Sequence, residues 1–297
     1  MLGMDRRRHL TGLAITVVGV VLISPDSLLI RLSLTDVWTL GFWRGIGLAT
    51  TLFAAQLIRH RGAIIPVFRR LGRPGLVASL LSGMGTVMFV AAVQHTSVAN
   101  ALILIGASPL IAAILSRVFL GDHIPSRTWV AIGATLAGVG LAVGAGLEGP
   151  RWGDLFAAGT SICMAAYLTI VRGVGDLDMT PCVCISGVVA ALICWPLAQP
   201  WLIAPQGALY LGLLCLVVIP LSFSLITLAP RYLPSYEVSL IGALETFLGP
   251  LWVWLVLSEN PGIHAIVGGL IVITALAMHT IAGLGRGPDS VPLQQDA

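Results

Sequence analysis

Glu245 and Trp252 are two side chains with chemistry suited to binding a charged organic molecule, and both lie inside one long apolar stretch. A carboxylate in the hydrocarbon region of a membrane is costly and usually faces a cavity or a partner. Trp252 follows roughly two helical turns later, so both side chains would lie on one helix face. An acid beside an aromatic ring suits an ammonium group with an apolar body, as in an amino acid or organic cation. The alternative is a protonated Glu245 that serves packing only.

Further polar and aromatic candidates lie in other apolar stretches. Arg44 is suited to bind a substrate carboxylate or to pair with Asp26, and snorkelling to the outer interface is the alternative. Asp26 itself has a second interpretation as the cap of the turn at Ser24-Pro25. We expect Tyr167 and Phe89 to be cavity walls, with simple packing as the alternative. Residues near the ends of apolar stretches are candidates for a gate or for coupling, alongside Asp26; these are His95, Asn100 and Glu237.

Several classes of protein are excluded or disfavoured by missing motifs. No lysine occurs in the 297 residues, so an ATP-binding loop of the form G-x-x-x-x-G-K-[ST] is impossible. The metalloprotease motif H-E-x-x-H and the nucleophile elbow G-x-S-x-G are also absent. The five cysteines form no C-x-x-C pair, which disfavours a metal site or a disulfide framework. No segment resembles a channel filter. We therefore expect no enzyme, cofactor or metal, and an intramembrane enzyme or a channel stays the alternative outside the transporters.

The elements that must position these residues are membrane-spanning helices. Hydrophobic residues make up 57% of the chain, charged residues 10%, and the mean hydropathy is +0.97. A spanning helix needs roughly 20 mostly apolar residues. The sequence predicts an all-α integral membrane protein with ten transmembrane helices, at 10–30, 37–58, 75–95, 98–120, 127–146, 153–172, 180–199, 206–228, 235–257 and 262–284.

Loop arginines set the expected orientation. If the N-terminus is cytoplasmic, only Arg31 and Arg151 fall in loops on the opposite side, and the other loop arginines all face the cytoplasm. Such a bias determines how multi-pass proteins insert. We expect a protein of the inner (cytoplasmic) membrane with both termini in the cytoplasm and a disordered tail at 286–297.

The chain also contains an internal repeat. Phe119 to Asp122 closes the fourth expected span, and Val256 to Glu259 closes the ninth, 137 positions later. The same shift places the first five spans on the last five. An odd number of helices inverts the second copy, so we expect two inverted five-helix repeats, 1–148 and 149–285, around a central cavity. Inverted repeats are typical of alternating-access transporters with a substrate site near the midplane.

Glycines and prolines that interrupt helices come in corresponding pairs, which point to binding sites and moving parts. The third span contains Gly83 and Gly85, and its counterpart, the eighth, contains Pro220. The fourth contains Pro109, and its counterpart, the ninth, contains Gly249 and Pro250. We expect hinges at these positions. Ser108, next to Pro109, corresponds to Glu245 and is expected to bind substrate. Thr246 stands where the first copy has Pro109, so we expect the bend in the ninth span to be displaced to Gly249-Pro250.

The order of several motifs resembles the drug/metabolite transporter superfamily, particularly its EamA-type members. The motifs are Phe42-Trp43-Arg44-Gly45, Gln94 to Ala101, Ser108-Pro109-Leu110, Phe119 to Asp122, Glu245 to Trp252 and Ser258-Glu259. The resemblance covers essentially the whole chain. It implies efflux of small metabolites, with amino-acid exporters, including the aromatic type, fitting best. Broad cationic-drug and nucleotide-sugar carriers of the same fold are the alternatives. The expected partners are a small-molecule substrate and the lipid bilayer, not nucleic acid, with homo-oligomerisation left open.

Overall fold

The computed structural model describes residues 2–60, 64–122, 124–144, 152–175 and 177–258, with scattered positions between 263 and 278. All regular elements in these ranges are helical. The first half contains α1 (Leu2–Ile23), α2 (Asp26–Leu32), α3 (Val37–His60), α4 (Ile64–Arg69), α5 (Gly72–His95), α6 (Val98–Ile105), α7 (Ser108–Leu115), η1 (Ser116–Leu120) and α8 (Ser126–Gly144). The second contains α9 (Trp152–Gly173), α10 (Thr180–Cys194), α11 (Pro205–Leu213), η2 (Leu214–Val218), α12 (Ile219–Leu228), η3 (Ala229–Arg231), α13 (Ser235–Gly242) and α14 (Glu245–Leu257).

Many of these helices join into rods long enough to span a bilayer. Six segments of the described chain meet that condition by length and composition: Arg7–Leu32, Gly72–His95, Val98–Leu120, Trp152–Gly173, Pro205–Arg231 and Ser235–Leu257. The helices α3, α8 and α10 lie over three further expected spans. The tenth expected span, 262–284, falls mostly outside the described residues, and the tail 286–297 does so entirely.

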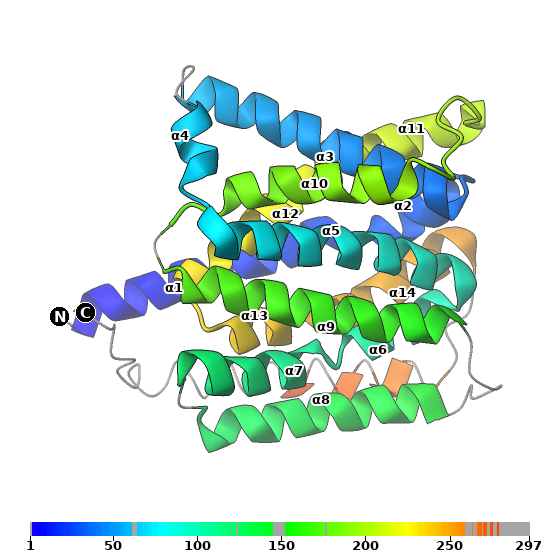
Figure 1. The fold of residues 1–297 in the computed structure, drawn as a ribbon. Coiled ribbons are helices and arrows are strands. Elements are labelled where there is room, and N and C mark those ends of the chain that lie inside the picture. The colour runs from blue at the N-terminus through cyan, green and yellow to red at the C-terminus, as the bar shows by residue number, and fades with distance from the viewer. Residues whose placement is uncertain are drawn as a thin grey trace.

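The rods lie side by side, as Figure 1 shows for α3, α10, α5 and α9. The helix α5 packs against both α9 and α10, and α1 packs against α12. The rods are numbered as the expected spans. The fourth rod, formed by α6, α7 and η1, packs along the ninth, formed by α13 and α14, since α7 contacts α13 and α6 contacts α14. Helices from the two halves of the chain therefore alternate through the bundle, and its core lies between them.

Small residues allow α3 and α10 to cross at close range. A Cβ atom added at Gly45 would lie 2.5 Å from the carbonyl oxygen of Gly187, and one added at Gly187 would lie 2.6 Å from the carbonyl oxygen of Gly45. Small residues allow such backbone contact between membrane helices. By contrast, a Cβ added at Gly133 or Gly140 of α8 would meet nothing within 4 Å. Close packing therefore requires glycine at the α3–α10 crossing but not at Gly133 or Gly140.

Two rods break at corresponding positions. The turn at Gly106 and Ala107 separates α6 from α7, and the turn at Ala243 and Leu244 separates α13 from α14. The two turns lie 137 positions apart. Pro109 stands in the first turn of α7, where a proline costs no helical hydrogen bond.

The expected displacement of the bend in the ninth span to Gly249-Pro250 is wrong. The helix α14 continues through both residues, with Pro250 in its interior. Neighbouring helices can support a proline inside a membrane helix. Here Gly249 packs so closely on Leu102 of α6 that an added Cβ would clash with that side chain. Glycine at position 249 therefore allows α14 to pack closely against α6. The break in the ninth rod lies before Glu245 instead.

The third and eighth rods differ from the expected pair of interruptions. The helix α5 is unbroken through Gly83 and Gly85. A Cβ at Gly83 would lie 2.7 Å from the carbonyl oxygen of Ser186, which explains the glycine by its contact with α10. In the eighth rod Pro220 stands in the first turn of α12, directly after the π-helical turn η2. Proline has no backbone N–H to donate to the preceding turn, and that turn is here the wider π-helical one.

Candidate functional site

A cavity of about 550 Å³ lies inside the bundle, between helices of both halves. Its polar residues come from five helices, and its remaining wall is apolar. The residues that line it are Ile23, Asp26, Arg44, Leu81, Ser82, Gly85, Thr86, Phe89, Ile105, Thr160, Met164, Phe223 and Glu245. An apolar cavity with a few polar groups is typical of a small-molecule site.

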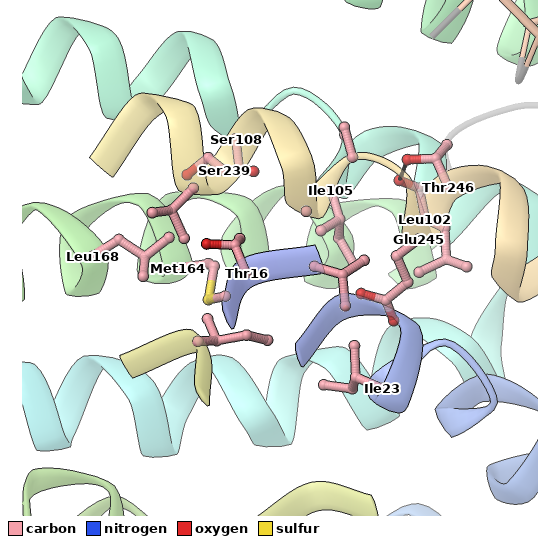
Figure 2. Close-up of a pocket in the computed structure, with 16 residues that line it drawn as sticks. Thr16, Ile23, Leu102, Ile105, Ser108, Met164, Leu168, Ser239, Glu245 and Thr246 are labelled. Atoms are coloured by element: carbon pink, nitrogen blue, oxygen red, sulfur yellow. Dashed lines mark hydrogen bonds between the residues drawn. The ribbon is translucent and has the colours of Figure 1, made fainter. Parts of the chain in front are cut away.

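A second cavity of about 580 Å³ adjoins the first, and Figure 2 shows its lining. Both helix breaks contribute to it, through Gly106 on one side and Ala243 on the other. Four residues line both cavities, namely Ile23, Ile105, Met164 and Glu245. The two cavities are therefore neighbouring lobes, and Glu245 is the only charged residue among the four that they share.

Arg44 and Asp26 form a buried ion pair in the wall of the first lobe. Nη1 of Arg44 donates to Oδ1 of Asp26, and Nη2 donates to Oδ2 at 2.9 Å. Each residue is 1% exposed. The guanidinium also lies over the ring of Phe89, with Cζ 5.5 Å from the ring centroid. A buried bidentate pair of this kind is a strong charge-assisted contact. It keeps the net charge of the pair at zero.

The position of Asp26 follows from a break in the first rod. The turn at Ser24 and Pro25 separates α1 from α2, so that Asp26 is the first residue of α2. An acid at a helix N-terminus is favoured by the helix dipole. The indole Nε1 of Trp252 donates to Oγ of Ser24 at 2.9 Å and ties this turn to α14.

Glu245 is the first residue of α14 and follows directly on the break of the ninth rod. Figure 2 shows its carboxylate pointing toward Ile23 and away from Thr246. Oε1 of Glu245 is buried and accepts no hydrogen bond within the described residues. Buried polar atoms nearly always have partners, so an exception calls for an explanation. A bound cation or a hydroxyl donor in the cavity would supply the missing partner.

Three other buried polar atoms that line the lobes lack a partner in the described part of the chain. They are Nε of Arg44 and Oγ of Ser82 in the first lobe, and Oγ of Ser239 in the second. Across the break, Oγ1 of Thr246 donates to the carbonyl oxygen of Leu102 at 3.3 Å. The site thus offers donors and acceptors within walls that are mostly hydrocarbon.

The structure brings most of the predicted substrate residues together. Glu245 lines both lobes, Ser108 lines the second, and Arg44 and Phe89 line the first. Asp26, a predicted gate residue, and Gly85, a predicted hinge, line the first lobe as well.

Tyr167 and Trp252 line neither lobe. Tyr167 is 1% exposed, and its hydroxyl bonds to that of Thr227. The indole of Trp252 is instead engaged with Ser24, as described above. Tyr167 was expected as a cavity wall and Trp252 as a substrate-binding aromatic, and neither role is found in these two lobes. Each ring binds a neighbouring helix through its polar atom, as buried Tyr and Trp usually do.

The remaining gate candidates lie away from the two lobes. Nδ1 of His95 lies 2.9 Å from the carbonyl oxygen of Ala91. The backbone N–H of Asn100 donates to Oγ of Ser97, which caps α6. Oε2 of Glu237 lies 4.0 Å from Nε2 of His9. A role for these residues in gating stays a prediction.

Sequence reasoning missed several residues of the lining. Ser82, Thr86 and Thr160 were visible only as polar positions within apolar stretches, a weak signal that many other positions share. Met164 and Phe223 gave no signal, because apolar side chains are the rule in these helices. The described residues contain no cluster of three or more His, Cys, Asp or Glu that could hold a metal ion.

Comparison with known proteins identifies a relationship that covers nearly all of the chain. The model of the EamA-like transporter family matches it twice, over residues 10–144 and 151–281. No curated protein matches the chain. Among solved structures 29 chains match. One crystal structure is 16% identical, aligns over 92% of this chain and 98% of its own, and has a TM-score of 0.75. At that identity the likeness concerns the fold alone.

Proposed function

The chain belongs to the EamA-like transporter family, and on that premise we propose that it exports small amphipathic metabolites bearing an ammonium group, including aromatic and other amino acids. It is a multi-pass membrane protein, and its family transports small molecules. The proposal adds the substrate class, the outward direction and an alternating-access mechanism.

The unpartnered carboxylate oxygen of Glu245 carries the proposal of the substrate class. An ammonium group would donate to this oxygen, which belongs to a residue that lines both lobes. The apolar body of the substrate would lie against side chains such as Ile105, Met164 and Phe223. A charge-assisted hydrogen bond of this kind is worth about 1.5–3 kcal/mol. It therefore contributes enough to select for a cationic group.

Equivalence of the two halves supports alternating access. The family model matches once in each half, in line with repeats at 1–148 and 149–285. The helix α6 (Val98–Ile105) corresponds to α13 (Ser235–Gly242) under the shift of 137 positions, and both are followed by a two-residue turn. Helix contacts also recur under that shift, since α5 packs on α9 as α12 packs on α1. Two such halves around one cavity can expose it to either side in turn.

The membrane orientation is part of the same proposal. We place both termini in the cytoplasm and the protein in the inner membrane, because the loop arginines then gather on the cytoplasmic side. Arg59, Arg172 and Arg231 lie together at that end of the bundle. Arg59 and Arg231 share Asp178, and Arg172 donates to the carbonyl oxygen of Pro230.

Counterflow in proteoliposomes tests the function. Vesicles containing the purified full chain would be loaded with one unlabelled amino acid at a time and supplied with the labelled form outside. We expect saturable uptake that depends on the internal substrate, with an aromatic amino acid among the active compounds. Uptake that rises linearly without saturation would indicate a channel. Absence of counterflow for amino acids and for organic amines would overturn the proposal.

A further inference from the structure

The charges in the substrate cavity do not match those of a free amino acid. Within the described chain, Arg44 is the only positively charged residue that lines either lobe, and Asp26 and Glu245 are the only acids. Both terminal nitrogens of Arg44 are already bonded to Asp26. The remaining ionisable group is Glu245, whose Oε1 lacks a partner. The cavity therefore has an unpaired acceptor for an ammonium group, whereas its one cation is already neutralised by Asp26 and offers a carboxylate only the Nε–H of Arg44.

A substrate carboxylate in this cavity would be unfavourable for two reasons. It would leave water and gain at most one hydrogen bond, from Nε of an arginine that Asp26 already neutralises, and burial of a charge without an opposite charge is costly. It would also lie in a low-dielectric space beside the like charge of an ionised Glu245. An ammonium compound without a carboxylate avoids both costs and keeps the contact with Glu245.

Asp26 is held in place on Arg44 by several contacts. Arg44 is enclosed by the ring of Phe89 as well as by Asp26. The turn before Asp26 is fixed by the hydrogen bond between Trp252 and Ser24. Trp252 belongs to α14, the helix that begins with Glu245. The acid that neutralises Arg44 and the acid that is free to bind a cation are thus positioned by the same helix.

We infer that Asp26 is a specificity-determining residue, which takes the position on Arg44 that a substrate carboxylate would occupy. The carrier therefore prefers amines, and amides or esters of amino acids, over free amino acids. This inference rests on the proposed function and narrows its substrate class. In this arrangement Asp26 acts as an internal carboxylate, and removing its charge releases Arg44 for the carboxylate of a substrate.

The test compares two probes that differ only at the carboxyl group, phenylalanine and phenylalaninamide. Equilibrium binding to the full chain in lipid nanodiscs gives the ratio of their affinities. We expect the wild type to bind the amide about tenfold or more tightly than the acid, the effect of one lost ionic contact. In Asp26→Asn the preference should fall about tenfold or reverse. In Arg44→Gln, where Asp26 loses its partner, the preference should rise.

A matched control uses an aspartate outside the cavity. Asp154 in the first turn of α9 accepts a hydrogen bond from Thr96 and lines neither lobe, so Asp154→Asn should leave the affinity ratio unchanged. If Asp26→Asn fails to fold with an unpaired buried arginine, the double variant Asp26→Asn with Arg44→Gln removes both charges. The double variant should keep the preference of the wild type, because Glu245 still repels a carboxylate.

The outcomes separate the inference from the function beneath it. Failure of the wild type to bind either probe would count against the proposed function. Equal binding of both probes by the wild type would overturn the inference alone. An affinity ratio in Asp26→Asn equal to that of the wild type would also overturn the inference. So would a change of the ratio in the same direction in Asp26→Asn and Arg44→Gln. Loss of the preference in the double variant would also contradict the role assigned to Asp26.

Discussion

Gly121 and Ser258 end the fourth and ninth rods in the same left-handed conformation, with φ of 69° and 57°, and they occupy equivalent positions 137 residues apart. Glycine adopts a positive φ without a penalty, whereas a residue with a Cβ pays about 1 kcal/mol. We expect Ser258→Gly to raise the free energy of unfolding by about this amount and Gly121→Ser to lower it similarly. A Cβ at Gly121 meets nothing within 4 Å, so the cost there would come from the backbone alone. Thermal unfolding in detergent measures the stability of both variants. If the two substitutions changed stability in the same direction, the structural equivalence of Gly121 and Ser258 would be contradicted.

Transport should depend on the charge of Glu245. Glu245→Gln keeps the shape of the side chain and removes the charge that an ammonium group would bind. We expect amino-acid or amine transport to fall about tenfold or more, the effect of losing a charge-assisted contact. Membrane abundance, measured by immunoblot, should stay unchanged. Asp154→Asn is the control with the same change from acid to amide. Flux in Glu245→Gln close to that of the wild type would remove Glu245 from the site.

The α3–α10 crossing should tolerate no added methyl group. In Gly45→Ala and Gly187→Ala the new Cβ would press on backbone atoms of the opposite helix, which cannot rotate away. Overpacking of this kind costs about 1–3 kcal/mol. Gly133→Ala of α8 is the matched control, since its Cβ meets nothing within 4 Å. It should leave stability unchanged or raise it, and unfolding temperatures in detergent compare the three variants. Equal changes of the unfolding temperature in the three variants would contradict the close contact between α3 and α10.

Asp178 should stabilise the end of the bundle at which α3, α10 and η3 meet. Oδ2 lies 3.1 Å from Nη1 of Arg59, Oδ1 lies 3.0 Å from Nη2 of Arg231, and Thr180 donates to the same carboxylate. Burial tends to raise the pKa of Asp178, but the hydrogen bonds from Thr180 and the charges of Arg231 and Arg59 together leave it below its usual value.

The pH dependence follows from that direction. A carboxyl with a lowered pKa in the folded state contributes stability above its unfolded pKa of about 4 and loses it as pH falls through the folded value. Asp178→Asn should cost about 1 kcal/mol at pH 7, a small effect because Arg59 is 65% exposed. The difference between variant and wild type should shrink between about pH 4 and the lower folded value. Unfolding temperatures at pH 7 and pH 3 measure this, and a gap that widens in acid would contradict it.

Six of the ten expected spans are found in the described residues, and they were predictable because the bilayer imposes one simple condition on each helix, a run of apolar residues of fixed length. The fourth and ninth rods break 137 positions apart, in line with the shift read from the sequence. The shift did not predict the site of the break, because proline was taken as the cause. Pro250 is tolerated inside α14, while Ala243 and Leu244 form the turn without a proline or glycine. Tertiary packing, which a single sequence does not encode locally, decided between these positions.

The candidate site was predictable where a residue was out of place in a membrane. Glu245, Arg44 and Asp26 stood out because charges are rare there, and all three line the first lobe. Trp252 and Tyr167 line neither lobe. Little in the sequence could place them, because aromatic residues are common in membrane proteins and their direction depends on the rotation of each helix. The break before Glu245 and the contacts of each ring with a neighbouring helix set those directions.

The shared wall of the two lobes has a consequence for stoichiometry. Glu245 belongs to both lobes and carries at most one negative charge, so it could not neutralise two cations at once. A cation in one lobe would neutralise the acid and weaken its attraction for a second cation in the other. Each turnover would accordingly carry a single positive charge, and a cargo with two distant ammonium groups would leave one of them uncompensated.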